Sequence, residues 1–382
     1  MKVVFFGMNL NYGGGKIFGI NIVKEWLCNL DKNQVFAVLP HDKDYLEVWN
    51  QYGGLEDNVW FVNKTEYSRL GRLNLERSGK INNWLRKKKI SHILNATNLP
   101  LKNPPCTQVL FLHRAFLIAP INLYGRFYPW KKIMKIYFEK NFFKLMKKNV
   151  DKWVVQSEFM KENLNKELKV KDSLISVIPS GSAHEKSHPL NNQVNPILKK
   201  DKKEYFDIIV PTKSYDHKRL ITILDILNHY SFKKEIRFIT TLDKNIKKDR
   251  LLLDLFSKEI KSGKIKNLGF LSPQELHEQY LYSDAMYMPT LIESYGLPFV
   301  EAMYYSLPVI TFNTPIANEI CGDAAIYFEE DNISSLVQEI YKLVKDEDNF
   351  YKRRILSYKR YKEVGVTWER SAILLYNSII DG

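Results

Sequence analysis

Short apolar runs alternate with longer amphipathic stretches along the first half of the chain. Helical patterns fill most of the gaps between the runs, for example over Gly15–Leu30 and Lys131–Lys148. This alternation is typical of βαβ units that build a parallel sheet. The predicted strands of this half are Lys2–Gly7, Gln34–Leu39, Val59–Val62, His92–Asn95, Val109–His113, Lys152–Gln156 and Leu174–Pro179.

The pattern breaks over residues 181–204, which are polar, contain proline and have no apolar period, so we predict an interdomain linker there. A second series of strands and helices follows, and an amphipathic helix over Trp368–Ile380 ends it. The predicted strands of this series are Phe206–Val210, Ile236–Thr240, Ile265–Phe270, Ala285–Met288, Pro308–Phe312 and Ala324–Phe328.

The two series predict an α/β protein with two doubly wound, Rossmann-like domains that face each other across a cleft. We expect the first domain over residues 1–180, joined by a C-terminal helix over 368–382, and the second over 205–367. Ligands of such sheets bind at the carboxyl ends of the strands. We therefore expect the chemistry in loops that directly follow strands.

Composition narrows the class of partner. The chain has 382 residues, 45% of them hydrophobic and 26% charged, which suits two globular cores. The net charge of +14 indicates an anionic partner, and composition alone leaves nucleotide, nucleic acid and acidic lipid open. No apolar run approaches the roughly 20 residues that span a bilayer, and the three cysteines are scattered, so we expect a cytoplasmic protein.

The segment over residues 288–313 carries the densest chemistry. Pro289 ends a predicted strand, Gly296 allows a tight turn, and Leu297 with the proline after it opens a helix. The start of that helix can bind phosphate or sugar oxygens through backbone N–H groups and the helix dipole. Glu293 and Glu301, on either side of the turn, can each accept two hydrogen bonds from a diol. Taken alone, two glutamates in a strand–loop–helix segment are more often solvated acids.

Residues 293–310, which read ESYGLPFVEAMYYSLPVI, resemble the Glu-x7-Glu signature of the family 4 retaining glycosyltransferases, also called glycosyl transferases group 1. The family commonly has Gly-Phe where this chain has Ser294 and Tyr295, and glycine where it has Ser306. The resemblance continues through NLGFLSPQEL, YSDA, EICGDAA, VQSEF and VIPSG elsewhere in the chain. It implies the GT-B fold and transfer of a sugar from a nucleotide-diphosphate sugar with retention of configuration.

The resemblance also implies roles for individual residues in the second domain. Glu293 corresponds to the glutamate beside the donor sugar, and Glu301 to the one that holds the ribose. The backbone at Ser294, Tyr295, Gly296 and Leu297 corresponds to the stretch that contacts sugar and diphosphate. Lys213 and Lys218 follow the Phe206–Val210 strand, where many relatives have Arg and then Lys. Cations there can neutralise a departing diphosphate.

Two further candidates lie in the first domain. Gly14 and Gly15 belong to a glycine-rich loop between the first strand and the first helix, where backbone N–H groups can approach a phosphate. His113, at the end of a strand, corresponds to a family histidine near the donor sugar, although a lone histidine there is more often structural. Arg114 is a weaker candidate.

We expect no metal and no cofactor, with a UDP- or GDP-type sugar as co-substrate. Asp42-x-Asp44 and Asp346-x-Asp348 match a metal-binding spelling, and chance explains both. The spacing Gly13-x-Gly15-x-x-x-Gly19 with Asp42 also leaves open an NAD(P)-linked oxidoreductase, although its first glycine lies too far from the strand. The other alternative is a catalytically silent sugar- or membrane-binding protein of the same fold.

Residues 123–148 mix aromatic side chains with seven lysines and one arginine. Such a stretch either lies on an anionic membrane or forms a core helix whose other face is merely solvated. No recognised nucleic-acid module is present. The prediction is a hexosyltransferase-like enzyme that acts on a glycan or polyprenyl-linked acceptor in bacterial surface polysaccharide synthesis, at the inner face of the cell membrane.

Overall fold

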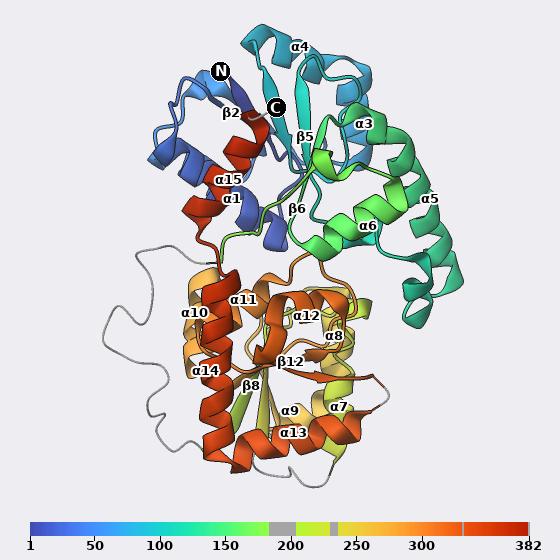
Figure 1. Cartoon of the computed structure of the whole chain (residues 1–382), viewed down its shortest axis with the longest axis vertical. Helices are drawn as coiled ribbons and strands as arrows, with labels where there is room; N and C mark the ends of the chain where they lie inside the picture. The colour runs from blue at the N-terminus through green and yellow to red at the C-terminus, as the bar shows by residue number, and fades with distance from the viewer. Residues whose placement is uncertain (183–203, 230–235, 331, 381–382) are drawn as a thin grey trace. The chain divides into compact units, whose positions relative to one another are not determined.

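The computed structural model describes residues 1–182, 204–229, 236–330 and 332–380, and the fold is built from these (Figure 1). The chain divides into two compact units, with one division between Glu185 and Lys186 and the other between Gly365 and Val366. The C-terminal helix therefore belongs to the first unit. Most of the predicted linker over 181–204 lies outside the described residues, so that assignment stays a prediction.

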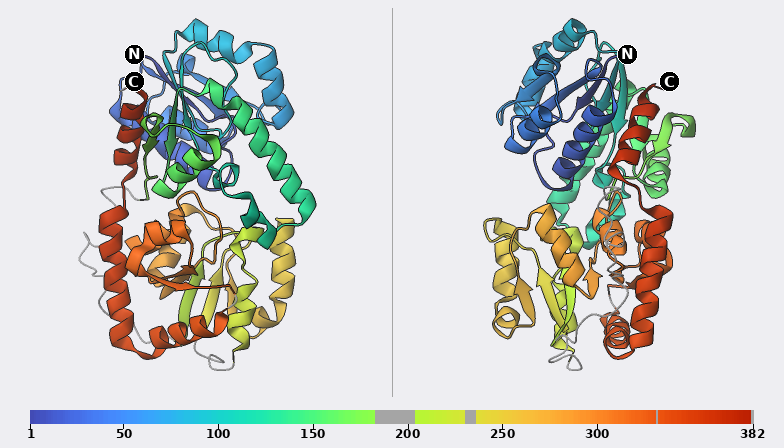
Figure 2. Two further views of the ribbon diagram at one scale, coloured as in Figure 1. Left: turned by 45° about the vertical axis from the view of Figure 1, so that its right-hand side comes forward. Right: turned by 90° about the vertical axis from the view of Figure 1, so that its left-hand side faces the viewer.

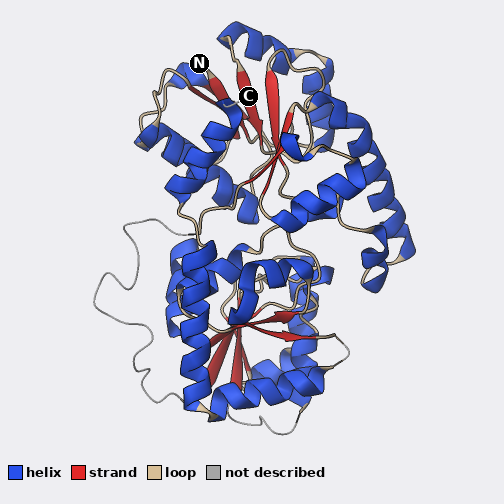
Figure 3. Ribbon diagram, viewed as in Figure 1, coloured by secondary structure: helices blue, strands red, loops and turns tan. Residues whose placement is uncertain are grey.

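The first unit contains a parallel sheet with helices on both faces (Figure 3). Its described strands run in the order β3-β2-β1-β4-β5-β6-β7. These strands are β1 (Val3–Phe6), β2 (Val35–Pro40), β3 (Val59–Val62), β4 (His92–Asn95), β5 (Thr107–Phe111), β6 (Lys152–Val155) and β7 (Ile175–Val177). The helices are α1 (Gly13–Asn29), α2 (Lys43–Gln51), α3 (Arg69–Arg77), α4 (Lys80–Lys88), α5 (Trp130–Met146), α6 (Glu158–Leu168) and α15 (Trp368–Ile380).

The second unit repeats this architecture with the strand order β10-β9-β8-β11-β12-β13 (Figure 2). Its strands are β8 (Phe206–Val210), β9 (Ile236–Thr240), β10 (Ile265–Asn267), β11 (Ala285–Tyr287), β12 (Val309–Phe312) and β13 (Ala325–Phe328). Its helices are α7 (Thr222–Asn228), α8 (Lys247–Leu255), α9 (Ser257–Lys261), α10 (Pro273–Tyr282), α11 (Leu297–Tyr304), α12 (Pro315–Cys321), α13 (Ile333–Lys345) and α14 (Glu347–Val364).

The cores explain why these segments become strands. All residues of β1 and β2 are buried, as are those of β11 and β12, and their apolar runs match sheets that are covered on both faces. The C-terminal helix α15 completes the first core: it packs beside α1, and the Trp26 indole donates to the Ala372 carbonyl at 3.1 Å (Figure 1). The predicted fold class, two doubly wound α/β domains, is confirmed.

The first helix begins two residues earlier than predicted. Gly13, Gly14 and Gly15 form the first turn of α1 and are not part of a loop before it. Gly13 has a φ of +59°, a conformation that glycine adopts without steric cost. The chain covers the distance from β1 with a turn in which the Leu10 N–H donates to the Gly7 carbonyl at 2.9 Å.

Candidate active site

The strand order of the second unit brings its two candidate loops together. Strands β8 and β11 are neighbours in the sheet although the helices and strands between them separate them in sequence. The loop after β8 carries Lys213 and Lys218, and the loop after β11 carries Glu293. This is the point where the strand order reverses, the usual ligand position of a doubly wound sheet.

Lys218 and Glu293 meet at this point. The Lys218 ammonium donates to the Glu293 carboxylate, and its Nζ lies 3.5 Å from the Met288 sulfur. The Lys218 side chain is only 8% exposed and that of Glu293 17%. A charge held this far from water interacts more strongly with a ligand than a solvated one does. Lys218, which the sequence assigned to the leaving group, and Glu293, which it assigned to the sugar, are therefore in direct contact.

Short hydrogen bonds fix the loop that carries Glu293. The Thr290 hydroxyl donates to the Glu293 carboxylate at 3.1 Å, and the Leu291 N–H donates to the His217 carbonyl at 2.9 Å, which ties this loop to the Lys218 loop. From the neighbouring strand, the Thr311 hydroxyl donates to the Met288 carbonyl at 2.8 Å. The carboxylate thus has a defined position before any ligand arrives.

Helix α11 begins directly after this loop, as the sequence predicted. Gly296 precedes it with a φ of +78°, and a Cβ there would lie 2.5 Å from the Phe299 ring, so only glycine fits. No side chain caps the helix start, and Pro298 lies in its first turn. Ser294 and Leu297 are partly exposed. The first-turn N–H groups and the helix dipole can therefore serve an anion.

Tyr295 contributes differently from its neighbours. Its side chain is buried in the second unit, and its hydroxyl donates to the Val364 carbonyl at 3.3 Å. Burial raises the pKa of this phenol above its ordinary value. Because the ring is occupied in packing, only the backbone of Tyr295 remains for the predicted donor contact.

Glu301 lies on α11 and is paired with a tyrosine of α10. The Tyr280 hydroxyl donates to the Glu301 carboxylate at 3.0 Å. Burial raises the pKa of Glu301 to about 7, and the hydrogen bond from Tyr280 opposes that rise. The group therefore changes charge near neutral pH, and its ionised form offers the lone pairs that a pair of hydroxyls requires.

Lys213 lies in the same loop as Lys218 but in a different environment. Burial lowers its pKa, while the carboxylates of Asp249 and Asp243 raise it. Asp249 is itself 1% exposed and accepts hydrogen bonds from the Ser214 N–H at 2.9 Å and the Ser214 hydroxyl at 2.7 Å. This aspartate holds the loop in place and keeps negative charge next to the cation.

The first unit brings its own candidates together. A Cβ added at Gly15 would lie 3.6 Å from Cε1 of His113, and one added at Gly14 would meet no atom within 4 Å. Tyr12 precedes α1 without a side-chain cap. Gly14, Gly15 and His113 thus form one cluster at the carboxyl end of the first sheet, and the lysines and glutamates form another in the second unit.

His113 is held as a neutral ring. Its Nε2 lies 3.0 Å from the Ala96 carbonyl, which accepts, and 2.5 Å from the Asn98 NH₂ group, which donates. Its backbone N–H donates to the Asn98 side chain at 2.8 Å. Burial lowers the pKa of His113 to about 4, and the Arg114 cation adds to this effect. A neutral imidazole keeps one ring nitrogen with a lone pair for a hydroxyl donor, whereas a phosphate would need a cation. The Arg114 guanidinium itself pairs with Glu139 at 3.2 Å.

The aspartates that match other motifs have structural partners. Lys16 Nζ lies 2.7 Å from Asp42 and 2.8 Å from Asp44, and Asp42 also caps α2. A dinucleotide enzyme would use the acid at this position on the ribose. Gly19, the last glycine of that fingerprint, leaves room for the Tyr45 hydroxyl. A Cβ at position 19 would lie 2.3 Å from the hydroxyl oxygen. Asp346 caps α14. None of these features supports the oxidoreductase alternative.

Known proteins resemble the second unit in sequence and the whole chain in fold. Residues 199–363 match the family "Glycosyl transferases group 1". The O-antigen chain mannosyltransferase RfbU of Salmonella typhimurium is 26% identical over 210 residues, which is 55% of this chain and 55% of that protein. The chain thus spans about half the length of that curated relative.

Two solved structures match almost the whole chain. The HepE protein of Anabaena, in complex with UDP and glucose, has a TM-score of 0.71 at 15% identity and covers 99% of both chains. WaaG, a glycosyltransferase involved in lipopolysaccharide biosynthesis, has a TM-score of 0.72 at 14% identity and covers 100% of both. The second unit is thus similar to the group 1 glycosyltransferases, and the fold of the chain is GT-B, as the sequence resemblance implied.

Sequence reasoning missed the side chains that position the candidates. Thr290, Tyr280, Asp249 and Asn98 bind or orient Glu293, Glu301, the Lys213 loop and His113, respectively. Thr290 and Asn98 each lie shortly after the end of a predicted strand. A search for polar residues that follow strand ends would therefore have included both. Tyr280 and Asp249 lie on helices far away in sequence, and nothing in their local pattern distinguishes them.

Proposed function

We propose that this protein transfers a glycosyl group from a UDP- or GDP-type sugar to a glycan or lipid-linked acceptor, with retention of configuration and without a metal ion. The observation that carries the proposal is the Lys218–Glu293 pair beside the uncapped start of α11. It provides, within one loop cluster, a cation for phosphate, a carboxylate for sugar hydroxyls and oriented backbone N–H groups.

In the proposed reaction the diphosphate leaves from the face that the acceptor attacks. The bond between the anomeric carbon and the diphosphate oxygen breaks, and the departing oxygen takes the proton from the acceptor hydroxyl as the new glycosidic bond forms. Lys218 and Lys213 stabilise the negative charge that develops on the diphosphate. When the phosphate engages the Lys218 ammonium, Glu293 becomes available to orient the sugar.

The remaining residues bind the donor. Glu301, when ionised, accepts hydrogen bonds from the ribose hydroxyls, and neutral His113 accepts one from a sugar hydroxyl. Gly14 and Gly15 allow a close approach of the first turn of α1 to the diphosphate or the acceptor. The similarity to O-antigen and lipopolysaccharide enzymes supports a place in bacterial surface polysaccharide synthesis.

The experiment that tests this proposal is a panel of UDP- and GDP-sugars in a thermal-shift assay, followed by detection of released nucleoside diphosphate. A donor that the protein uses should raise the melting temperature, because a ligand that binds only the folded state stabilises it. The same donor should release nucleoside diphosphate. Stabilisation without release would favour the catalytically silent alternative, and a response to NAD(P) alone would contradict the proposal.

The protein is also proposed to contact an anionic membrane through α5. This helix buries Ile136, Lys140 and Phe143, so these residues form the face that packs against the rest of the first unit. Its other faces expose large apolar side chains, and Figure 2 shows the helix on the outer side of the first unit. The exposed residues are Trp130 (69%), Met134 (43%), Tyr137 (49%), Phe138 (65%), Phe142 (44%) and Leu145 (72%).

Lysines lie between these apolar residues. Lys131 and Lys135 are exposed, and together with Met134 and Phe138 they line a shallow hollow along the helix. A merely solvated helix face would not expose so many aromatic rings. Aromatic and basic residues mixed on one helix are typical of a helix that lies in a membrane interface. No described helix is both long enough and apolar enough to cross a bilayer. Contact through α5 would bring the enzyme to a lipid-linked acceptor at the inner face of the membrane.

A further inference from the structure

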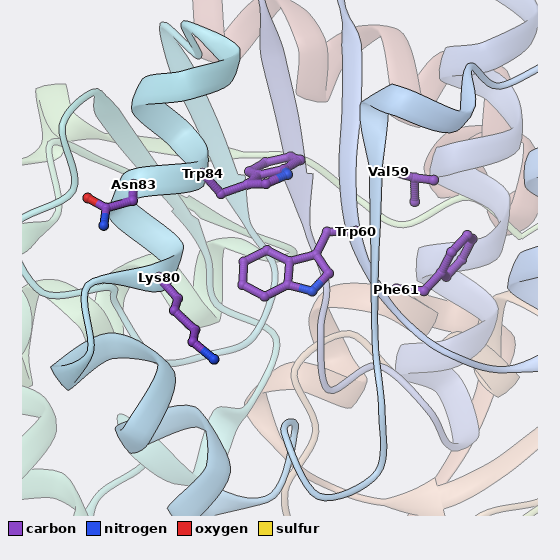
Figure 4. A pocket seen from close by; sticks show the side chains of 6 residues that line it. All are labelled: Val59, Trp60, Phe61, Lys80, Asn83 and Trp84. Carbon is purple, nitrogen blue, oxygen red and sulfur yellow. The ribbon is translucent and has the colours of Figure 1, made fainter.

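An aromatic hollow at the edge of the first sheet has no role in the reaction described above. It has a volume of about 450 Å³ and is lined by Val59, Trp60, Phe61, Lys80, Asn83 and Trp84 (Figure 4). The first three residues belong to β3, the edge strand of the described sheet, and the others to α4. In Figure 4 the two indoles lie next to each other, and Val59 and Phe61 lie on the opposite side of the strand.

The two indoles are supported from behind. Their ring centroids lie 6.0 Å apart with an interplanar angle of 47°, and Trp84 also meets the Phe36 ring at 6.3 Å in a T-shaped arrangement. Both indoles pack against the buried cluster that contains Phe36, yet both remain partly exposed. Rings held in this way offer a ligand a partly exposed apolar surface with little loss of side-chain freedom.

Polar groups surround this apolar surface on one side. Lys80, Asn83 and Trp84 are spaced three and four residues apart, so they share one face of α4. The Arg86 guanidinium donates to the Asn83 side-chain oxygen at 3.4 Å. The NH₂ group of the Asn83 amide therefore points away from Arg86. The helix has no acidic residue, and its last turn adds Arg86, Lys87 and Lys88. The hollow therefore combines flat aromatic faces, an amide and an ammonium group, with no carboxylate among its lining residues.

We propose that this hollow is an accessory binding site for a saccharide, one segment of the acceptor or product glycan. A sugar ring has a C–H face that stacks on an indole and hydroxyls that bond to an amide or ammonium group. A purely apolar partner would cover the Lys80 ammonium and the Asn83 NH₂ group without replacing the water that they bind. Strand β3 lies two inter-strand spacings, about 10 Å, from β1, whose following helix carries Gly14 and Gly15. Because α1 packs against Phe5 while the two indoles pack with Phe36 on the other face of the sheet, a glycan would reach the glycines around the carboxyl edge of the sheet.

This inference rests on the proposed function, because it assumes a glycan acceptor, and its test is independent of catalysis. The indole N–H resonances of Trp60 and Trp84, assigned with Trp60→Phe and Trp84→Phe, are followed by NMR. The whole protein is titrated with maltoheptaose and with α-mannotetraose in the absence of a nucleotide sugar. We expect one of these saccharides to shift both resonances at millimolar concentration.

Two matched variants on α4 complete the test. Lys80→Ala should weaken saccharide binding about fivefold, the ratio expected for one lost hydrogen bond. Lys87→Ala, which removes the same charge from the same helix outside the hollow, should leave binding unchanged. Both residues are exposed, so neither change should affect folding.

Three results would overturn the site: neither saccharide shifts the two indoles, both variants weaken binding equally, or only a single-stranded oligothymidylate shifts them, which would indicate nucleic-acid stacking. Failure of the proposed function would look different. In that case no donor releases nucleoside diphosphate, while the two indoles still respond to the saccharide.

Discussion

Glu293 holds the ammonium of Lys218, and both side chains are largely shielded from water although they come from loops 75 residues apart. The pairing follows from the sheet, because β8 and β11 are neighbours and each loop leaves its strand at the carboxyl end. An ion pair with this burial is weak evidence of a stabilising role, since desolvation offsets much of the attraction. Its position at the switch point of the sheet favours a functional role.

The end of α11 supports a stability prediction at Ser306. This residue has a φ of +58° and is fully buried, and its hydroxyl has no hydrogen-bond partner in the described part of the chain. Its N–H donates to the Met303 carbonyl and that of Leu307 to the Ala302 carbonyl, a Schellman helix end whose left-handed residue is usually glycine. This conformation fits the glycine that the sequence resemblance implies at this position.

Ser306→Gly should therefore raise the free energy of unfolding by about 1 kcal/mol. The change removes the left-handed strain and the unsatisfied hydroxyl. The extra entropy that glycine gives the unfolded chain offsets only part of this gain. Urea unfolding gives the measurement. Ser306→Ala is the control: it removes the hydroxyl but keeps the Cβ, so it should stabilise less than glycine. A glycine variant less stable than the alanine variant would contradict this explanation.

Donor binding should weaken as pH falls through about 7, where Glu301 takes up a proton. The protonated acid has lost a lone pair that the ribose hydroxyls need. The free energy of unfolding depends on pH in the opposite direction to donor binding. Because the folded pKa lies above the ordinary value of 4.5, the contribution of Glu301 to stability is present below pH 4.5 and is lost as pH rises through 7.

The measurement is the donor Kd between pH 5.5 and 8.5. Tyr280→Phe removes the hydrogen bond that opposes the raised pKa, so the weakening should begin at a higher pH in this variant. Glu301→Gln should bind the donor weakly at every pH. A wild-type Kd that stays constant across this range would rule out the ribose role of Glu301.

His113 should remain neutral over the same range. Burial lowers its pKa to about 4, so its ring should show no titration between pH 5.5 and 8.5 in ¹⁵N NMR. His113→Asn keeps an acceptor and a donor and should retain part of the activity, whereas His113→Phe should lose about 10- to 100-fold in kcat/KM if one hydrogen bond to the sugar is lost in the transition state. A ring that titrates near pH 6.5 would refute the acceptor role.

The strands could be read from the sequence because buried parallel strands are continuous apolar runs, as in β1 and β12. The turn at Gly296 and the start of α11 could be read as well, because glycine and proline determine the local backbone. Contacts made across the sheet could not. Asp249 on α8 reaches the Lys213 loop, and Tyr280 on α10 reaches Glu301 on α11. The left-handed conformation of Ser306 appeared in the sequence only as a departure from the family pattern.

Membrane binding through α5 should depend on both its lysines and its aromatic residues. Lys131→Glu with Lys135→Glu should strongly reduce sedimentation with phosphatidylserine liposomes, since each basic residue near an anionic surface contributes about 1 kcal/mol. Trp130→Ala with Phe138→Ala should also reduce it, on neutral as well as anionic liposomes. Lys258→Glu with Lys261→Glu on α9 makes the same charge change elsewhere and should bind as the wild type does. Equal losses in the two charge variants would indicate net charge alone and discard the α5 contact.

The most direct test of the account is the rate of nucleoside diphosphate release by Lys218→Gln, Glu293→Gln and the double variant, in excess EDTA. If the pair only stabilises the fold, the double variant has no unpaired buried charge and should regain both stability and activity. The account predicts that the double variant regains stability in a thermal melt while its rate stays about 10²- to 10³-fold below the wild type, the usual effect of losing one transition-state charge contact. A double variant with nearly wild-type release would contradict it, and so would a wild-type rate abolished by EDTA.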